Sequence, residues 1–228
     1  MTVKAGQKCT AIRRALVPAA LADAVTSAVS ARLAGVVVGD PADPDTTMGP
    51  LASLAHREEV RTAIAKLGAV GRIAYGRPDV VQVHGADASQ GAFLSPILLR
   101  CDDRSAAAPH DVEAFGPVAT VIPYDGLDEA VTLAARGEGS LAGSIVTRDP
   151  SVATRLIQGL APWHGRLLVL NRDDAAESTG HGTAMPQLLH GGPGRAGGGA
   201  ELGGLRALDH YLQLTAVQGH PDLLAGIT

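Results

Sequence analysis

The sequence predicts an α/β fold in three layers, with a mostly parallel sheet flanked by helices. Short apolar stretches typical of strands alternate along the chain with helical patterns of about 10–15 residues, which indicates crossover connections. The stretch 166–171 is almost continuously apolar, as expected of a strand that is buried on both faces. With 228 residues, 46% of them hydrophobic, the chain is long enough for a domain core and an appendage.

The first half of the chain is divided by proline and polar loop residues. Pro18 ends the first apolar stretch, and Ser53 is suited to cap a following helix. Residues 39–50 are rich in Asp, Pro and Gly and are expected to form a loop. Pro96 interrupts an apolar stretch, which places that strand at a sheet edge or at the end of an element. We expect strands at 14–18, 70–75 and 92–99, and helices at 19–33 and 54–67.

The second half repeats the alternation and then changes character. Residues 173–204 contain ten glycines and are expected to form a long loop, which is usually functional or mobile. Residues 210–217 alternate in part and are a candidate edge strand, to which a partner subunit could add. We expect strands at 117–124, 142–147 and 166–171, and helices at 127–136 and 151–160.

Composition excludes several classes of function. The formal charge of −4 and the lack of a basic run argue against a nucleic-acid partner. Two cysteines, Cys9 and Cys101, form neither a disulfide framework nor a zinc site, and His110, His181 and His190 are scattered, so we expect no metal. No apolar run reaches the roughly 18–20 residues that span a membrane, and the first residues lack a signal-peptide pattern. A cytoplasmic protein is expected.

Cys9 is the most informative single residue. It follows Gly-Gln-Lys at residues 6–8. A thiolate can attack a carbonyl carbon, a nearby helix N-terminus would lower its pKa, and its own backbone N–H could stabilise the resulting oxyanion. From residue chemistry alone, an ordinary buried cysteine is the commoner explanation.

Glu113 is a second candidate. It lies two residues before Phe115 and just ahead of Gly116 and Pro117, which lead into a predicted strand. A carboxylate at such a strand entry can accept hydrogen bonds from a ribose diol. The ordinary alternative is a solvated loop acid.

The glycine-rich segment 190–199 is a third candidate. Glycine loops that contain an arginine, here Arg195, can cradle phosphate groups. This segment lacks the Gly-x-x-x-x-Gly-Lys-Ser/Thr spacing, and no strand leads directly into it. A flexible loop is the favoured interpretation.

Five motifs in the right order resemble the C-terminal, catalytic half of the aldehyde dehydrogenase superfamily along nearly the whole chain. They lie at residues 6–9, 39–51, 113–118, 168–171 and 200–204. The resemblance implies a catalytic domain over 1–205, and an oligomerisation strand and tail over 206–228 that would join copies into a homo-oligomer.

The same resemblance implies roles for individual residues. Cys9 would attack the aldehyde to give a thiohemiacetal and then, after hydride loss, a thioester that water hydrolyses. Glu113 would bind the nicotinamide ribose, Phe115 would pack near the nicotinamide, and His56 would be a polar ribose contact. The implied cofactor is NADP or NAD, and the implied partner is an aldehyde substrate.

Residues 8–14, 190–199 and 210–219 are similar to one branch of that superfamily. Its members oxidise CoA-linked semialdehydes in the breakdown of phenylacetate and other aromatic acids, so such a semialdehyde is the expected substrate. In the superfamily the general-base glutamate, the oxyanion-hole asparagine and the dinucleotide-binding domain precede the nucleophile, whereas eight residues precede Cys9 here. We therefore expect a fragment.

Two other functions stay open at this point. One is a non-catalytic remnant or assembly module that keeps the tail strand for oligomerisation. The other is cofactor-independent thioester hydrolysis or acyl transfer by Cys9, because the step after hydride loss needs no nicotinamide.

Overall fold

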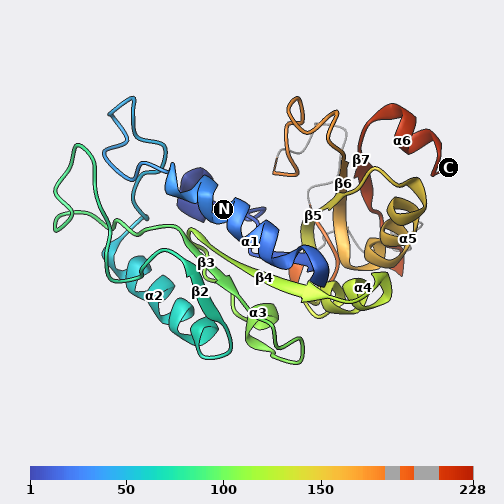
Figure 1. Cartoon of the computed structure of the whole chain (residues 1–228), viewed down its shortest axis with the longest axis horizontal. Helices are drawn as coiled ribbons and strands as arrows, with labels where there is room; N and C mark the ends of the chain where they lie inside the picture. Colours follow the sequence, from blue (N-terminus) through green and yellow to red (C-terminus); the bar gives the residue numbers. More distant parts are fainter. Residues whose placement is uncertain (183–190, 198–210, 228) are drawn as a thin grey trace. The chain divides into compact units, whose positions relative to one another are not determined.

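A computed structural model describes residues 1–182, 191–197 and 211–227, and these form two compact units (Figure 1). The first unit is Met1–Asp125 and the second is Gly126–Thr228, and each is described by itself. The predicted boundary at residue 205 lies outside the described residues, so the division into 1–205 and 206–228 stays a prediction.

The first unit is built on a four-stranded sheet with the order β1-β4-β3-β2. β1 and β3 run parallel to β4 on its two sides, whereas β2 is antiparallel to β3. The strands are β1 (Arg14–Pro18), β2 (Arg72–Tyr75), β3 (Ile97–Arg100) and β4 (Val118–Tyr124), and the helices are η1 (Val3–Gly6), η2 (Ala19–Leu21), α1 (Ala22–Ala34), α2 (Leu54–Gly68) and α3 (Ala108–Asp111).

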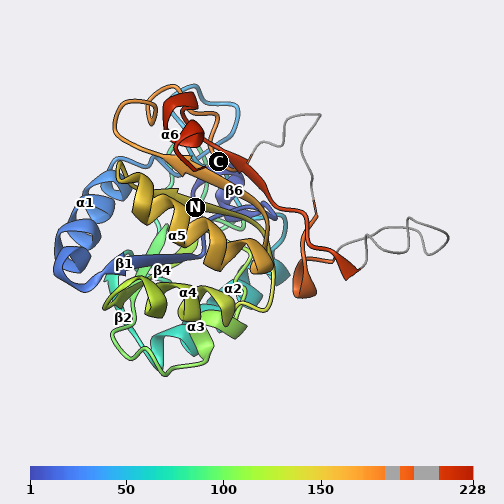
Figure 2. The ribbon, with the colours of Figure 1, turned by 90° about the vertical axis from the view of Figure 1, so that its right-hand side faces the viewer.

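Helices cover both faces of this sheet because the side chains of a strand alternate between its faces. On β3, Ile97 and Leu99 pack into one core with α2, whereas Leu98 packs into a second core with α1. All three side chains are buried. Figure 2 shows α1 on one side of β1 and β4 and α2 on the other.

Most expected elements of the first unit are confirmed, and one expectation is wrong. β1 has the predicted bounds, and α2 begins where Ser53 was expected to cap it, with Ser53 Oγ accepting a hydrogen bond from His56 N–H at 3.0 Å. β3 is not an edge strand, since it lies between β2 and β4. The strand begins at Ile97, directly after Pro96, so the alternative expectation that Pro96 marks the end of an element is confirmed.

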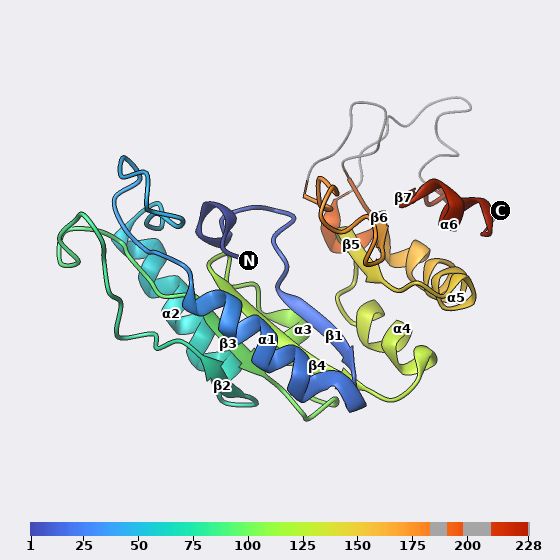
Figure 3. The same cartoon turned by 45° about the horizontal axis from the view of Figure 1, so that its top comes forward.

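The second unit contains a three-stranded parallel sheet with the order β5-β6-β7 (Figure 3). β6 is buried along six of its seven residues, which confirms the strand that was expected to be covered on both faces. One core joins Leu167 and Val169 of β6 to residues of α5 and α6. The elements are α4 (Leu127–Ala135), β5 (Ser140–Val146), α5 (Pro150–Leu160), η3 (Ala161–Trp163), β6 (His164–Leu170), η4 (Gly194–Ala196), β7 (Ala216–Gln218) and α6 (Pro221–Ala225).

The described part of the glycine-rich segment, residues 191–197, packs tightly against β5 and β6 instead of forming an open loop. A Cβ atom on Gly165 of β6 would lie 1.7 Å from the carbonyl oxygen of Gly191, and Arg195 N–H donates to the carbonyl oxygen of Glu138 at 2.8 Å. These glycines allow close backbone contact, so residues 191–197 pack on the sheet, while their flexibility stays a prediction.

The described residues thus form an α/β fold with mostly parallel sheets flanked by helices, as the sequence predicts. Among these residues, none of the helices has both the length and the apolar character needed to cross a membrane.

Candidate functional site

Cys9 lies in the turn between η1 and β1, and its side chain is exposed. The other cysteine, Cys101, is buried and donates from Sγ to the carbonyl oxygens of Val70 and Asp103, both at 3.3 Å. Burial therefore explains Cys101 but not Cys9. No helix begins at Cys9, so the expected helix N-terminus is not found in this turn.

The backbone just before Cys9 packs directly on the backbone just before β4. A Cβ atom on Gly6 would lie 1.9 Å from the carbonyl oxygen of Gly116 and 2.8 Å from the nitrogen of Pro117. Gly6 also has a φ of +73°, in the region that favours glycine. Gly116 in turn packs on Val60 of α2. The segment around Cys9 and the segment 113–118 therefore meet, although they are about a hundred residues apart.

Gln7 connects the segment around Cys9 to the loop before α2. Its side-chain amide donates to the carbonyl oxygens of Lys4 at 3.0 Å and of Pro50 at 3.4 Å, and its Oε1 accepts from Ala52 N–H at 2.8 Å. One side chain thus binds two backbone groups of residues 50–52 and one of its own turn. Gln7 brings a third motif, the loop 39–51, against the turn that carries Cys9.

The three residues expected at the cofactor lie at one place in the first unit. The His56 and Phe115 rings are 6.3 Å apart between centroids, with their planes 36° apart. Phe115 has a φ of +47°, which is uncommon for a residue with a bulky side chain, and its ring is 43% exposed. Glu113 is two residues before Phe115 and is exposed as well.

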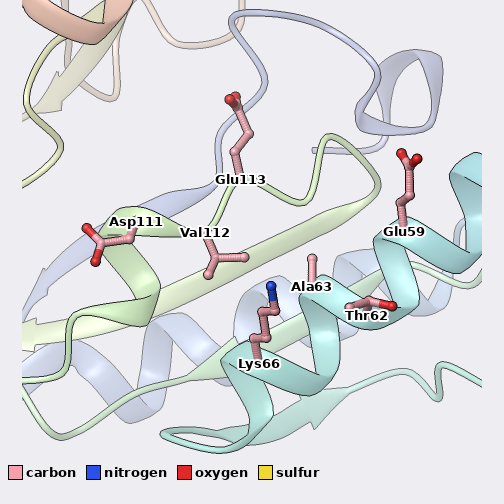
Figure 4. Close-up of a pocket in the computed structure, with 7 residues that line it drawn as sticks. All are labelled: Glu59, Thr62, Ala63, Lys66, Asp111, Val112 and Glu113. Atoms are coloured by element: carbon pink, nitrogen blue, oxygen red, sulfur yellow. The ribbon is translucent and has the colours of Figure 1, made fainter.

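Two cavities adjoin this cluster. The larger, of about 420 Å³, is drawn in Figure 4, where Glu59, Thr62, Ala63 and Lys66 come from α2 and Asp111, Val112 and Glu113 from the segment that faces it. The smaller, of about 20 Å³, is lined by two segments of the chain. These are the turn after Gly6, with Lys8, Ala11, Ile12 and Arg13, and the stretch from Glu113 to Gly116, with Val118. Glu113 is the residue that both cavities share.

The remaining predicted motifs contribute less to this site. Asn171 Oδ1 accepts from the backbone N–H of Asp173, which indicates a local turn role. Glu201 lies outside the described residues. Among the described residues, potential metal-binding atoms of Asp43, Asp45 and His84 lie within 4.8 Å of one another. His84 Nε2 lies 3.1 Å from Asp43 Oδ2, so these two side chains bind each other and we assign no metal.

An exposed carboxylate and an exposed aromatic ring therefore lie on a segment that packs against the turn of an exposed thiol. The sequence indicated Cys9, Glu113, Phe115 and His56. The structure places Glu113 and Phe115, with His56 beside the Phe115 ring, next to the turn that carries Cys9. The sequence did not indicate which backbone groups Gln7 binds. The only available signal was its place beside Cys9 in a shared motif.

Comparisons with known proteins show the family to which the chain belongs. The sequence matches the Aldehyde dehydrogenase family over residues 1–217. It is 50% identical over 182 residues to Protein MaoC of Klebsiella aerogenes, an alignment covering 79% of this chain and 52% of that protein. It is 45% identical over 194 residues to 3,4-dehydroadipyl-CoA semialdehyde dehydrogenase of Aromatoleum evansii, covering 85% of this chain and 38% of that enzyme.

Solved structures are similar as well. A crystal structure of betaine aldehyde dehydrogenase from Staphylococcus aureus in complex with NAD+ superposes with a TM-score of 0.74 at 27% identity, over 92% of this chain and 39% of that one. The chain spans about half the length of the first curated relative, at 52%, and a smaller share of the second, at 38%.

The hydrogen bonds of Gln7 give a direct test of this site. Gln7→Leu removes all three bonds, so we expect amide exchange at Ala52 to accelerate about 10-fold and the first unit to lose about 1–3 kcal/mol of stability. Gln7→Glu keeps an acceptor for Ala52 N–H and should slow that exchange back toward the wild-type rate. Hydrogen exchange followed by NMR, with urea unfolding, measures both quantities.

The matched control is Gln82→Leu, the same substitution at an exposed glutamine outside both cavities. It should leave exchange at Ala52 unchanged. Equal exchange at Ala52 in wild type and Gln7→Leu would show that Gln7 does not hold the loop.

Proposed function

Because this chain belongs to the aldehyde dehydrogenase family, we propose that it supplies the nucleophile and part of the cofactor site for NAD(P)-dependent oxidation of an aldehyde to its acid. The observation that carries the proposal is the meeting of the turn around Cys9 with the segment 113–116 at one cavity. An exposed thiol and a carboxylate on facing segments are the groups that this chemistry needs.

Cys9 is the proposed nucleophile. Its thiolate attacks the carbonyl carbon, a C–S bond forms, and the π electron pair moves to oxygen, to which the backbone N–H of Cys9 would donate. Loss of a hydride from the same carbon gives a thioester, and water then releases the acid and returns the thiol. The nicotinamide dinucleotide, when bound, supplies the hydride acceptor.

Glu113, Phe115 and His56 are the proposed cofactor residues. A carboxylate is a natural acceptor for the two hydroxyl groups of a ribose, and an exposed aromatic ring offers a flat surface for a nicotinamide. His56 is half-buried beside the Phe115 ring and offers a polar ring edge. The three residues fit the nicotinamide-ribose end of either NADP or NAD, and they share the cluster that adjoins the turn of Cys9.

The proposed substrate is a CoA-linked semialdehyde from aromatic-acid breakdown. Support comes from the relative in Aromatoleum evansii, whose name gives its substrate as 3,4-dehydroadipyl-CoA semialdehyde and which is 45% identical over 194 residues. A free aldehyde of similar length is the comparison substrate that tests whether CoA contributes to recognition.

The tail is the proposed site of homo-oligomerisation. β7 lies at an end of its sheet. Just before it, Gln213 donates to the carbonyl oxygen of His164 at 3.2 Å, and Thr215 donates to those of Ala161 and His164 at 2.7 Å. Leu212 and Leu214 alternate with these residues and are 63% and 66% exposed. Polar side chains thus face the chain and apolar ones face outward, which favours coverage by a second copy.

The proposed activity is tested first at Cys9. The chain, mixed with a CoA-linked semialdehyde and NADP or NAD, should produce reduced cofactor, measured by its absorbance. Cys9→Ser should abolish this production, because the weaker nucleophile has no base assigned to it. Cys101→Ser is the control and should keep activity if its fold survives. Equal rates with Cys9→Ser would refute the role of Cys9, and no reduced cofactor from a folded wild-type chain would favour a non-catalytic module instead.

The cofactor role is tested at Glu113. Glu113→Gln removes the charge that strengthens a hydrogen bond to a ribose hydroxyl, so the KM for the dinucleotide should rise about 10-fold while kcat changes less. Glu58→Gln is the matched control on the neighbouring helix, since Glu58 pairs with Arg57 and Arg61 and lines neither cavity. An unchanged KM in Glu113→Gln would assign the ribose to other residues.

The oligomer is tested by Leu214→Asp. A charge in an apolar contact between copies should convert the assembly to monomers, measured by sedimentation velocity. Val80→Asp places the same charge at an exposed valine of the first unit and should leave the oligomer intact. A monomeric wild-type chain would contradict the proposed role of the tail.

A further inference from the structure

A partly buried side-chain contact joins the strand that follows Cys9 to the helical turn that precedes Glu113. Arg14, the first residue of β1, places its NH1 atom 2.8 Å from Nδ1 of His110 in α3. His110 is only 2% exposed. From the sequence His110 had no assigned role, because the histidines are scattered along the chain without paired metal-ligand spacing.

The chemistry of the pair fixes the position of a proton. A guanidinium group has N–H donors and no acceptor, so Arg14 can only donate in this contact. Nδ1 of His110 must therefore carry its lone pair, and the neutral ring must have its proton on Nε2. An imidazolium would point a second N–H at the guanidinium and could not form the contact.

The helical turn that contains His110 is too short to be stable without contacts to the rest of the unit. α3 has four residues, and one helical turn is unstable in isolation. Its position follows from tertiary contacts, which include the burial of Pro109 and His110, the packing of α3 on α2, and the bond to Arg14.

The position of α3 is passed on to Glu113 through a short connection. Val112 N–H donates to the carbonyl oxygen of Ala108 at 2.9 Å, and the Val112 side chain packs on the core around α2. Glu113 is the next residue, and the unusual backbone of Phe115 follows two positions later. Movement of α3 would therefore move the carboxylate that lines both cavities.

We propose that Arg14 and His110 are a positioning pair, which holds the segment 111–116 in register with the strand after Cys9 and requires the neutral Nε2–H form of His110. The functional part of this inference rests on the proposed cofactor role of Glu113. The pair touches no reacting atom. It acts by setting where the carboxylate stands relative to the turn of the nucleophile.

The ring proton is tested on the unmodified chain. Two-dimensional NMR of the histidine ring nitrogens distinguishes a protonated from an unprotonated Nδ1. The proposal predicts an unprotonated Nδ1 and a protonated Nε2 at His110 at neutral pH. A protonated Nδ1 would overturn it, because Arg14 could not then donate there.

The positioning role is tested with paired variants and hydrogen exchange. His110→Leu keeps volume and loses the acceptor, so amides 111–116 should exchange about 10-fold faster, while amides of β6 in the other unit stay unchanged. His110→Asn keeps an acceptor near the place of Nδ1 and should stay within about 3-fold of wild type. Equal acceleration in both variants would show that ring packing, and not the hydrogen bond, holds the segment.

Two variants of Arg14 test the same bond in case His110→Leu does not fold. Arg14→Lys keeps a charged donor and should preserve slow exchange at 111–116, whereas Arg14→Met should accelerate it. No difference between these two variants would overturn the proposal.

Kinetics then separate the inference from the proposed function. In a chain that forms reduced cofactor, His110→Leu should raise the KM for the dinucleotide and His110→Asn should restore it. A KM that stays unchanged while exchange accelerates would leave the positioning role standing and refute the cofactor role of Glu113. Slow exchange in every variant would refute the positioning role whatever the kinetics.

Discussion

A Cβ atom on residue 6 would lie 1.9 Å from the carbonyl oxygen of Gly116, so the segment before Cys9 reaches the entry of β4 only as bare backbone. This contact determines which face of the turn remains open. The packed side of the turn lies against residues 113–117, and the thiol of Cys9 remains exposed. The side-chain amide of Gln7 also ties this segment to the loop before α2, because it binds backbone groups on both sides of Leu51. Every role proposed for Cys9 depends on this geometry.

Sheet topology explains why the two segments meet. β1 and β4 are parallel neighbours, with Arg14 opposite Thr120. The residues that lead into two adjacent parallel strands lie at the same edge of the sheet, so residues 6–13 and 113–117 come together there. The cores on both sides of β3 and β4 hold these strands. The Arg14–His110 contact then joins the strand that follows one of these segments to the helical turn that precedes the other.

Local sequence signals predicted much of the fold. Pro18 and Ser53 mark the end of a strand and the start of a helix by chemistry that acts within a few residues, and both boundaries agree with the structure. The place of β3 in the sheet depends on its neighbours β2 and β4, so Pro96 gave a misleading indication of an edge. α3 escaped prediction because four residues carry no periodic pattern. The same holds for the site. Local motifs indicated Cys9 and Glu113, whereas the contacts of Gln7 and His110 could not be predicted because they join residues far apart in sequence.

The central claim is that three distant segments form one site around Cys9, and alkylation of that thiol tests it most directly. Amide chemical shifts of the labelled chain are compared before and after reaction with iodoacetamide, which reaches the exposed Cys9 and not the buried Cys101. The structure predicts shift changes in residues 6–12, in 50–56 and in 113–117 together, with none in β6. Changes confined to the immediate neighbours of Cys9 would show that the thiol stands apart from the other two segments and would contradict the account.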